Sequence, residues 1–171
     1  MRHEIVKYNP IYYDKNGIYT IDEWTSRSDV GKCYNGKAFS IEDYLAVEQQ
    51  YIDAALSIMD AAKCAYMTIH YIEADKKYIV DRIKSSKFYD IDLPLLQSLP
   101  LLSKGKKIHY TKIGNVCRLA LREYIYVVLR NDKHKLQIEF GYDYYMKVSS
   151  SLSNTILQEK VNKIGLFLDP R

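Results

Sequence analysis

Alternation of hydrophobic and polar positions is strongest near the end of the chain, in residues 136–148 (LQIEFGYDYYMKV). The even-numbered positions are apolar or aromatic, while the odd-numbered ones include Glu139, Asp143 and Tyr145. A period of two is that of a β-strand with one buried and one exposed face. The pattern predicts one strand across the whole segment, with a bulge at Gly141, because glycine in mid-strand favours an irregularity.

A helical period begins after Ser40, whose hydroxyl is suited to an N-cap. Acidic Glu42 and Asp43 follow in the first turn, where they complement the helix dipole. Apolar residues then recur every three or four positions. The pattern predicts a long helix over 41–62.

The other predicted elements are shorter. Pro94 and Pro100 exclude a long helix from the segment that contains them, so it is expected to form a structured loop of short or 3₁₀ turns. Asn16-Gly17 is a strong hairpin signal. The predicted elements are a hairpin of 11–13 with 18–21, strands over 65–73 and 106–110, and helices over 76–84 and 154–163.

The segment 116–130 is ambiguous. Cys117, Ala120 and Leu121 fit a helical face, whereas the closing Tyr-Ile-Tyr-Val-Val is rich in β-formers. We predict a strand from Val116 to Arg130, bulged near Glu123, with a helix as the alternative.

The order of these elements predicts an α+β fold. We expect an antiparallel sheet packed against one long N-terminal helix, with a small N-terminal hairpin and a short C-terminal helix. One sheet face packs against the long helix and the other is partly exposed to water. A chain of 171 residues suits a single domain spanning 1–171.

Charge and cysteine content argue against several classes of protein, namely nucleic-acid-binding, disulfide-rich and metal-binding proteins. The net charge of +4 arises from 25 Lys and Arg against 21 Asp and Glu, interspersed and without a basic tract, so direct nucleic-acid binding is not expected. Three separated cysteines without a CxxC motif predict neither a disulfide framework nor a metal site. With no signal peptide or membrane span in the sequence, we expect a cytoplasmic protein without a membrane partner.

Enzyme motifs are scarce in the sequence. It contains no phosphate-binding glycine loop, no GxSxG and no HExxH, and its four histidines are isolated. We therefore expect no catalytic residue and no cofactor. The 17 tyrosines instead favour a binding surface, because tyrosine is enriched among the energetic anchors of protein interfaces.

The segment YTIDEWTSRSDVG has two interpretations. Its Asp and Ser side chains could bond nearby backbone amides while Trp24 fills the core. Alternatively it is a recognition loop, in which Asp22, Glu23 and Asp29 surround Trp24 as an aromatic anchor for a cationic partner. Both interpretations stay open from the sequence.

The candidate partner-binding residues combine that loop with the last strand. In the strand, Glu139, Asp143 and Tyr145 lie on the side predicted to be exposed. The full candidate set is Asp22, Glu23, Trp24, Asp29, Glu139, Asp143 and Tyr145.

Four parts of the sequence carry a family resemblance. They are DEWTSRSDVG (22–31), the helix opening with Tyr44 and Glu48, LALRE (119–123) and FGYDYYM (140–146). Together they resemble the immunity proteins of contact-dependent growth inhibition and related polymorphic toxin systems, over about residues 8 to 148.

The resemblance implies a non-enzymatic cytoplasmic protein that binds a cognate toxin domain, often a nuclease, and occludes its active site. Many such proteins are acidic, whereas this chain is slightly basic, so a local acidic patch would pair with toxin Lys or Arg. An alternative is an RNA- or nucleotide-binding module that uses exposed tyrosines on the sheet. The sequence leaves a homodimer open.

Overall fold

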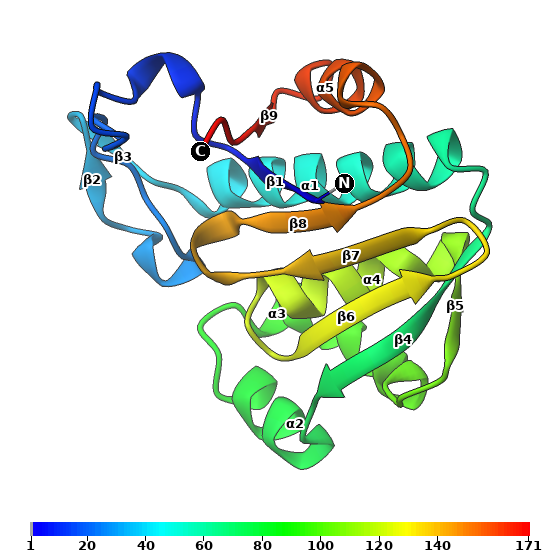
Figure 1. The fold of residues 1–171 in the computed structure, drawn as a ribbon. Coiled ribbons are helices and arrows are strands. Elements are labelled where there is room, and N and C mark those ends of the chain that lie inside the picture. The colour runs from blue at the N-terminus through cyan, green and yellow to red at the C-terminus, as the bar shows by residue number, and fades with distance from the viewer. Residues whose placement is uncertain (1) are drawn as a thin grey trace.

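The computed structural model, which describes residues 2–171, has the predicted α+β fold (Figure 1). Its main sheet has seven strands in the order β5-β4-β6-β7-β8-β1-β9, and every neighbouring pair is antiparallel. The strands are β1 (Arg2–Val6), β2 (Cys33–Tyr34), β3 (Lys37–Ala38), β4 (Tyr66–Glu73), β5 (Lys107–His109), β6 (Tyr126–Asn131), β7 (Leu136–Phe140), β8 (Met146–Ser149) and β9 (Phe167–Leu168). The helices are α1 (Ile41–Ala61), α2 (Lys76–Lys84), α3 (Tyr89–Asp92), α4 (Tyr110–Leu121) and α5 (Asn154–Asn162), with 3₁₀ turns at Pro10–Tyr12, Arg27–Asp29, Leu93–Leu101 and Tyr142–Tyr144.

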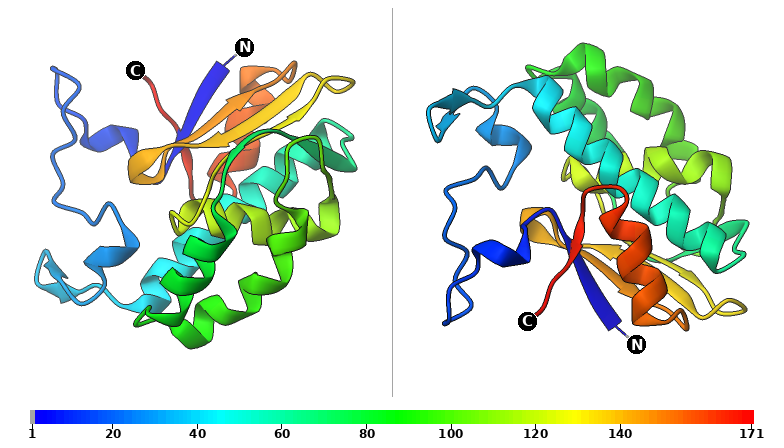
Figure 2. Two further views of the ribbon diagram at one scale, coloured as in Figure 1. Left: turned by 90° about the horizontal axis from the view of Figure 1, so that it is seen from below. Right: turned by 90° about the horizontal axis from the view of Figure 1, so that it is seen from above.

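Helices cover one face of the sheet. Figure 1 shows α1 and α4 behind the strands, and Figure 2 shows α5 beside α1. In Figure 1 no helix lies in front of β6, β7 and β8, and this open face carries exposed Arg130 and Tyr126. The sheet therefore has one face in the core and one face toward water, as predicted.

Helix α1 follows the predicted limits to within one residue. Ser40 accepts a hydrogen bond from the Asp43 amide and Asp43 accepts one from the Ser40 amide, which forms a capping box. The buried face of the helix presents Tyr44, Tyr51 and Ile58 to the core. The hydrophobic stripe read from the sequence is thus the surface that packs against the sheet.

Most of the shorter elements also agree with the predictions. Helix α2 has the predicted limits, and β4, β5 and α5 each lie within two residues of theirs. The proline-containing segment forms α3 and a 3₁₀ turn, Leu93–Leu101. The predicted hairpin of 11–13 with 18–21 is confirmed only as one antiparallel bridge, Tyr13 with Tyr19, around a turn whose Gly17 has a φ of 77°. The predicted strand over 11–13 is wrong, because Asn9 caps a 3₁₀ turn, Pro10–Tyr12, that takes up most of it.

The prediction of one strand over 136–148 is wrong. The segment forms two strands, β7 and β8, that pair with each other through a turn at 141–145. Phe140 opposes Met146, and both are buried. Residues that oppose each other share a face, so a five-residue connection preserves the alternation across the turn. The period of two therefore fits a hairpin as well as a single strand.

The prediction of one strand over 116–130 is also wrong. Helix α4 runs to Leu121, and β6 begins only at Tyr126. Buried Ile113, Val116, Cys117 and Ala120 form a helical stripe against the core, which continues upstream of the ambiguous segment. The predicted irregularity at Glu123 is the connection between helix and strand.

Candidate functional site

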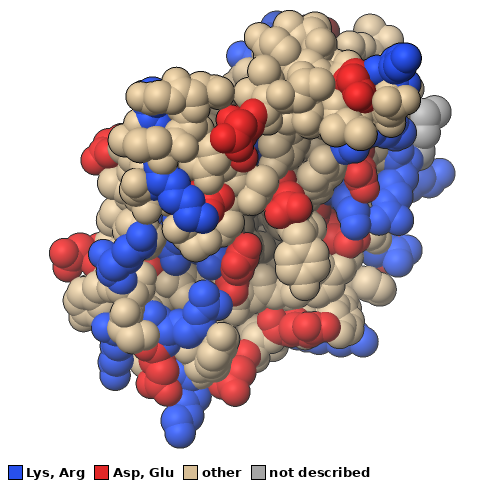
Figure 3. Space-filling model, turned by 90° about the vertical axis from the view of Figure 1, so that its left-hand side faces the viewer, with Lys and Arg blue, Asp and Glu red and all other residues tan. Residues whose placement is uncertain are grey.

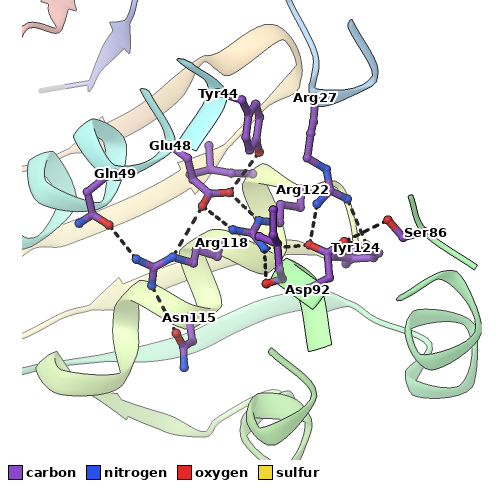
Figure 4. A network of polar contacts seen from close by, with 12 residues as sticks. Arg27, Tyr44, Glu48, Gln49, Ser86, Asp92, Asn115, Arg118, Arg122 and Tyr124 are labelled. Atoms are coloured by element: carbon purple, nitrogen blue, oxygen red, sulfur yellow. Dashed lines mark hydrogen bonds and ion pairs between the residues drawn. The ribbon is translucent and has the colours of Figure 1, made fainter. Parts of the chain in front are cut away.

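A buried network of charges lies where the N-terminal segment meets the helices (Figure 4). Arg122 donates two hydrogen bonds of 2.7 Å to Glu48, from Nε to Oε1 and from Nη2 to Oε2. Its Nη1 also donates to Asp92 at 2.8 Å, and Arg27 Nη1 donates to the same Asp92 oxygen at 2.6 Å. We call Arg27, Glu48, Asp92 and Arg122 the central ion network.

The central ion network joins four parts of the chain. Arg27 comes from the N-terminal segment, Glu48 from α1, Asp92 from the end of α3 and Arg122 from the end of α4. Burial alone would raise the pKa of Asp92, but hydrogen bonds from Arg27 and Tyr124 hold it below its ordinary value. Removing one member of such a buried network costs about 3–5 kcal/mol, because the others remain charged and unpaired. The network therefore fixes the 22–31 segment on the helices.

Trp24 belongs to the core. It is 7% exposed, stacks on Phe39 with ring centroids 4.5 Å apart, and meets the edge of Tyr144 at 5.0 Å. Tyr144 in turn contacts the rings of Tyr44 and Tyr51. The Trp24 ring is therefore occupied by intramolecular contacts in this conformation.

Asp29 is a structural residue of the same segment. Its carboxylate accepts hydrogen bonds from the amides of Thr25 and Ser26, at 3.0 and 3.2 Å, and pairs with Lys32 at 2.7 Å. These bonds form the turn network that was one of the two interpretations of this segment. Segment 22–31 also meets the start of α1, the connection that follows α4 and the β7–β8 turn through buried contacts.

Three other candidate residues surround a small pocket of about 210 Å³, the tyrosine pocket. Glu23, exposed Asp143 and half-buried Tyr145 lie at its edge. Glu23 pairs at 2.7 Å with Lys7, and the Arg171 Nη2 donates to the Tyr145 hydroxyl at 2.7 Å. The pocket lining is Tyr8, Tyr13, Tyr19, Ile21, Glu23, Thr25, Asp143, Tyr145 and Arg171.

A larger groove of about 850 Å³ is joined to the tyrosine pocket by the β7–β8 turn, since Tyr142 lines the groove and Asp143 lines the pocket. It is bounded by the start of α2, the α4–β6 connection and the β7–β8 turn. Figure 3 shows the left-hand side of the molecule as drawn in Figure 1, where carboxylates surround a hollow in the surface. We call this groove the acidic groove; it is lined by Glu73, Ala74, Asp75, Tyr78, Ala120, Glu123, Tyr124, Ile125, Tyr126, Glu139, Phe140, Gly141, Tyr142 and Lys147.

The acidic groove brings together residues that no sequence pattern connects. Of the earlier candidates only Glu139 lines it, accepting a 2.8 Å hydrogen bond from the Tyr126 hydroxyl with Lys147 at 3.9 Å. Burial and that carboxylate raise the pKa of Tyr126 to about 12. Asp22 is exposed on the N-terminal segment and lines neither cavity. Four glutamate and aspartate side chains against one lysine make the groove lining acidic.

No local sequence signal pointed to Glu73, Glu123, Tyr78 or Tyr142 as one surface. Glu73 ends β4, Tyr78 lies in α2, Glu123 follows α4 and Tyr142 lies in the β7–β8 turn, and only the folding of the sheet and α4 brings them together. Periodicity reveals a shared face only within one element, and these residues belong to different elements and turns.

Metal ligands do not gather in the part of the chain that the structure describes: among residues 2–171 no group of three His, Cys, Asp or Glu could hold an ion. Within the same residues, no helix combines the length and apolarity needed to cross a bilayer. Cys64 and Cys117 are buried thiols, and Cys33 is exposed.

No protein-family model, curated protein or solved structure matches this chain.

Proposed function

We propose that this chain is an immunity protein that binds a cognate toxin domain, of which a nuclease is the leading class, and occludes its active site in the cytoplasm. The observation that carries the proposal is that the acidic groove and the tyrosine pocket meet at the β7–β8 turn, where Tyr142 lines the groove and Asp143 lines the pocket. Carboxylates supply complementarity to Lys and Arg, and tyrosines supply large anchors that exclude water. Binding alone performs this task, so no residue of the chain needs to react.

The chain as a whole is slightly basic, with a net charge of +4, but the lining of the acidic groove is locally negative, as binding to a basic toxin requires. Nuclease domains present cations to the phosphate backbone, and a carboxylate-rich face competes for those cations. A nanomolar complex requires about 12 kcal/mol of binding free energy. An interface of about 1,600 Å² with several aromatic anchors suffices for this affinity.

The test is stoichiometric inhibition of the toxin encoded next to this chain's gene. Equimolar purified chain should abolish toxin activity, and Asp143→Asn should weaken binding about three- to tenfold, because it removes a rim charge. Asn tolerates the positive φ of 54° at this position, so the fold is retained. Asp132→Asn, in the turn at the opposite end of the β6–β7 pair, is the matched control. Full toxin activity with excess chain would refute the proposal.

RNA binding on the open sheet face is a second candidate. Lys107, Thr68 and Arg130 lie side by side across three strands, and the Lys107 ammonium lies 4.9 Å from the Tyr66 ring. Such a surface pairs phosphates with cations while tyrosines stack on bases. Salt-dependent binding of labelled oligouridine that weakens in Arg130→Gln would support it, and no binding at low salt would exclude it.

A further inference from the structure

We propose that the acidic groove receives an arginine side chain carried by the protein partner. The identification of that partner as a toxin rests on the function proposed above. The choice of arginine rests on the chemistry of the groove lining.

The groove has an apolar floor and an aromatic rim. Ile125 and Phe140 are buried beneath it, whereas Tyr78 and Tyr142 are 54% and 87% exposed. Exposed tyrosines of this kind are costly to leave in water and serve as anchors in a complex. The four carboxylates of the lining outnumber its one lysine together with the neighbouring Arg82, so the complementary occupant is a cation.

One wall of the groove already holds a guanidinium group from the same chain. The Arg82 guanidinium carbon lies 5.5 Å from the Tyr78 ring and 5.2 Å from the Tyr124 ring. Its Nη1 donates to the backbone oxygen of Glu123 at 3.0 Å. The tyrosine faces of this wall thus have the spacing that a planar cation requires.

Glu123 occupies a position that local structure disfavours. The amides of Glu123 and Tyr124 bond to the carbonyls of Ala120 and Leu119, which is a Schellman ending of α4 with Glu123 at the site that normally holds glycine. Its φ is 59°, and its negative charge lies at the carboxyl end of a helix, where the dipole repels it. Glu123 is exposed and lines the groove, and within residues 2–171 its carboxylate forms no ion pair.

Lys63, at the end of α1, is a useful comparison for Glu123 at the end of α4. It ends α1 in the same geometry, with a φ of 53° and bonds from the Lys63 and Cys64 amides to Asp60 and Met59. A lysine there is favoured by the helix dipole, whereas a glutamate is not. The structure thus tolerates two unfavourable features at Glu123, which is the pattern expected of a residue kept for binding.

Arginine fits this lining better than lysine. A guanidinium group can stack on Tyr78 or Tyr126 while its N–H groups face Glu123 and Glu139, whereas an ammonium is a more strongly hydrated point charge. The partner should therefore present an exposed arginine at the centre of its contact with this groove.

The test is titration of the full chain with N-acetyl-arginine amide, followed by amide chemical shifts in NMR spectra. N-acetyl-citrulline amide, a neutral isostere, is the control ligand. We expect arginine to shift groove amides with a dissociation constant on the order of millimolar, and citrulline to bind at least about threefold more weakly.

Glu123→Gly separates binding from folding. It relieves the backbone strain and the dipole repulsion, so the urea midpoint should rise, while arginine binding should weaken about two- to fivefold. Lys63→Gly should also raise the midpoint but leave arginine binding unchanged.

Equal binding of citrulline and arginine, shifts outside the groove, or unchanged binding in Glu123→Gly would each overturn the inference. Toxin inhibition by the chain is scored separately, so the proposed function stands if the toxin is inhibited while the arginine probe fails.

Discussion

Lys7 illustrates how one buried charge positions a surface segment. Its ammonium lies 4.2 Å from the Tyr8 ring, 4.3 Å from the Trp24 ring and 2.7 Å from a Glu23 oxygen. Burial lowers its pKa, and the hydrogen bond to Glu23 opposes that shift. Glu23 thus has a structural task in addition to its place at the tyrosine pocket, and a charge reversal there would disturb the fold as well as binding.

We expect Glu23→Gln to lower the free energy of unfolding by about 2 kcal/mol, since it leaves the Lys7 ammonium, whose side chain is 4% exposed, without a carboxylate. Lys7→Met should restore part of the loss in the double variant. A double-mutant cycle by urea unfolding should give a coupling of about 1–2 kcal/mol. Additive effects of the two changes would contradict the pairing.

At the scale of elements, a glycine after α5 leaves room for a hydrogen bond that joins this turn to α1. Gly165 has a φ of 90°, and a Cβ there would lie 2.8 Å from the Gln50 amide nitrogen. That nitrogen donates to the Ile164 oxygen at 2.9 Å, which ties the turn after α5 to α1.

Gly165→Ala should therefore destabilise the chain by about 1–2 kcal/mol, from backbone strain and displacement of Gln50. Amide hydrogen exchange should accelerate first in β9 and its pairing with β1. Gly36→Ala, which shares a positive φ but has open space around it, is the control for strain without a clash. Equal losses in the two variants would show that the Gln50 contact contributes nothing.

The β7–β8 hairpin and α4 also show where sequence patterns mislead at this scale. Alternation identified the buried side chains of 136–148 correctly except at Tyr142, which is 87% exposed, but it could not reveal the reversal of direction. Segment 116–130 contains a helical stripe followed directly by a run of β-forming residues. The sequence pattern alone did not locate the connection between them, which the structure places at 122–125, between α4 and β6.

At the scale of the whole molecule, tyrosine burial couples stability to alkaline pH. Burial raises the pKa of Tyr44, Tyr51 and Tyr144 well above their ordinary value of 10.0. In the unfolded chain these hydroxyls lose their protons near pH 10, whereas the folded chain retains them. The unfolded state then binds fewer protons, so stability falls as the pH rises above 10.

We predict cooperative unfolding at a pH above about 10, with ionisation of the buried tyrosines and loss of circular dichroism in a single transition. Ultraviolet absorbance of tyrosinate, recorded together with circular dichroism, checks this. Ionisation of all 17 tyrosines before any loss of structure would contradict the predicted coupling.

The sequence by itself determined the fold class, α1, α2, α5 and most of the buried positions, because capping residues and hydrophobic periods are local properties. It also singled out the 22–31 segment without deciding between core and surface. Only the tertiary structure decided that Trp24 and Asp29 lie in the interior and that Glu23 and Asp143 share a pocket. The acidic groove likewise exists only in three dimensions, since its residues come from separate helices, strands and turns whose positions depend on how strands pair and helices pack.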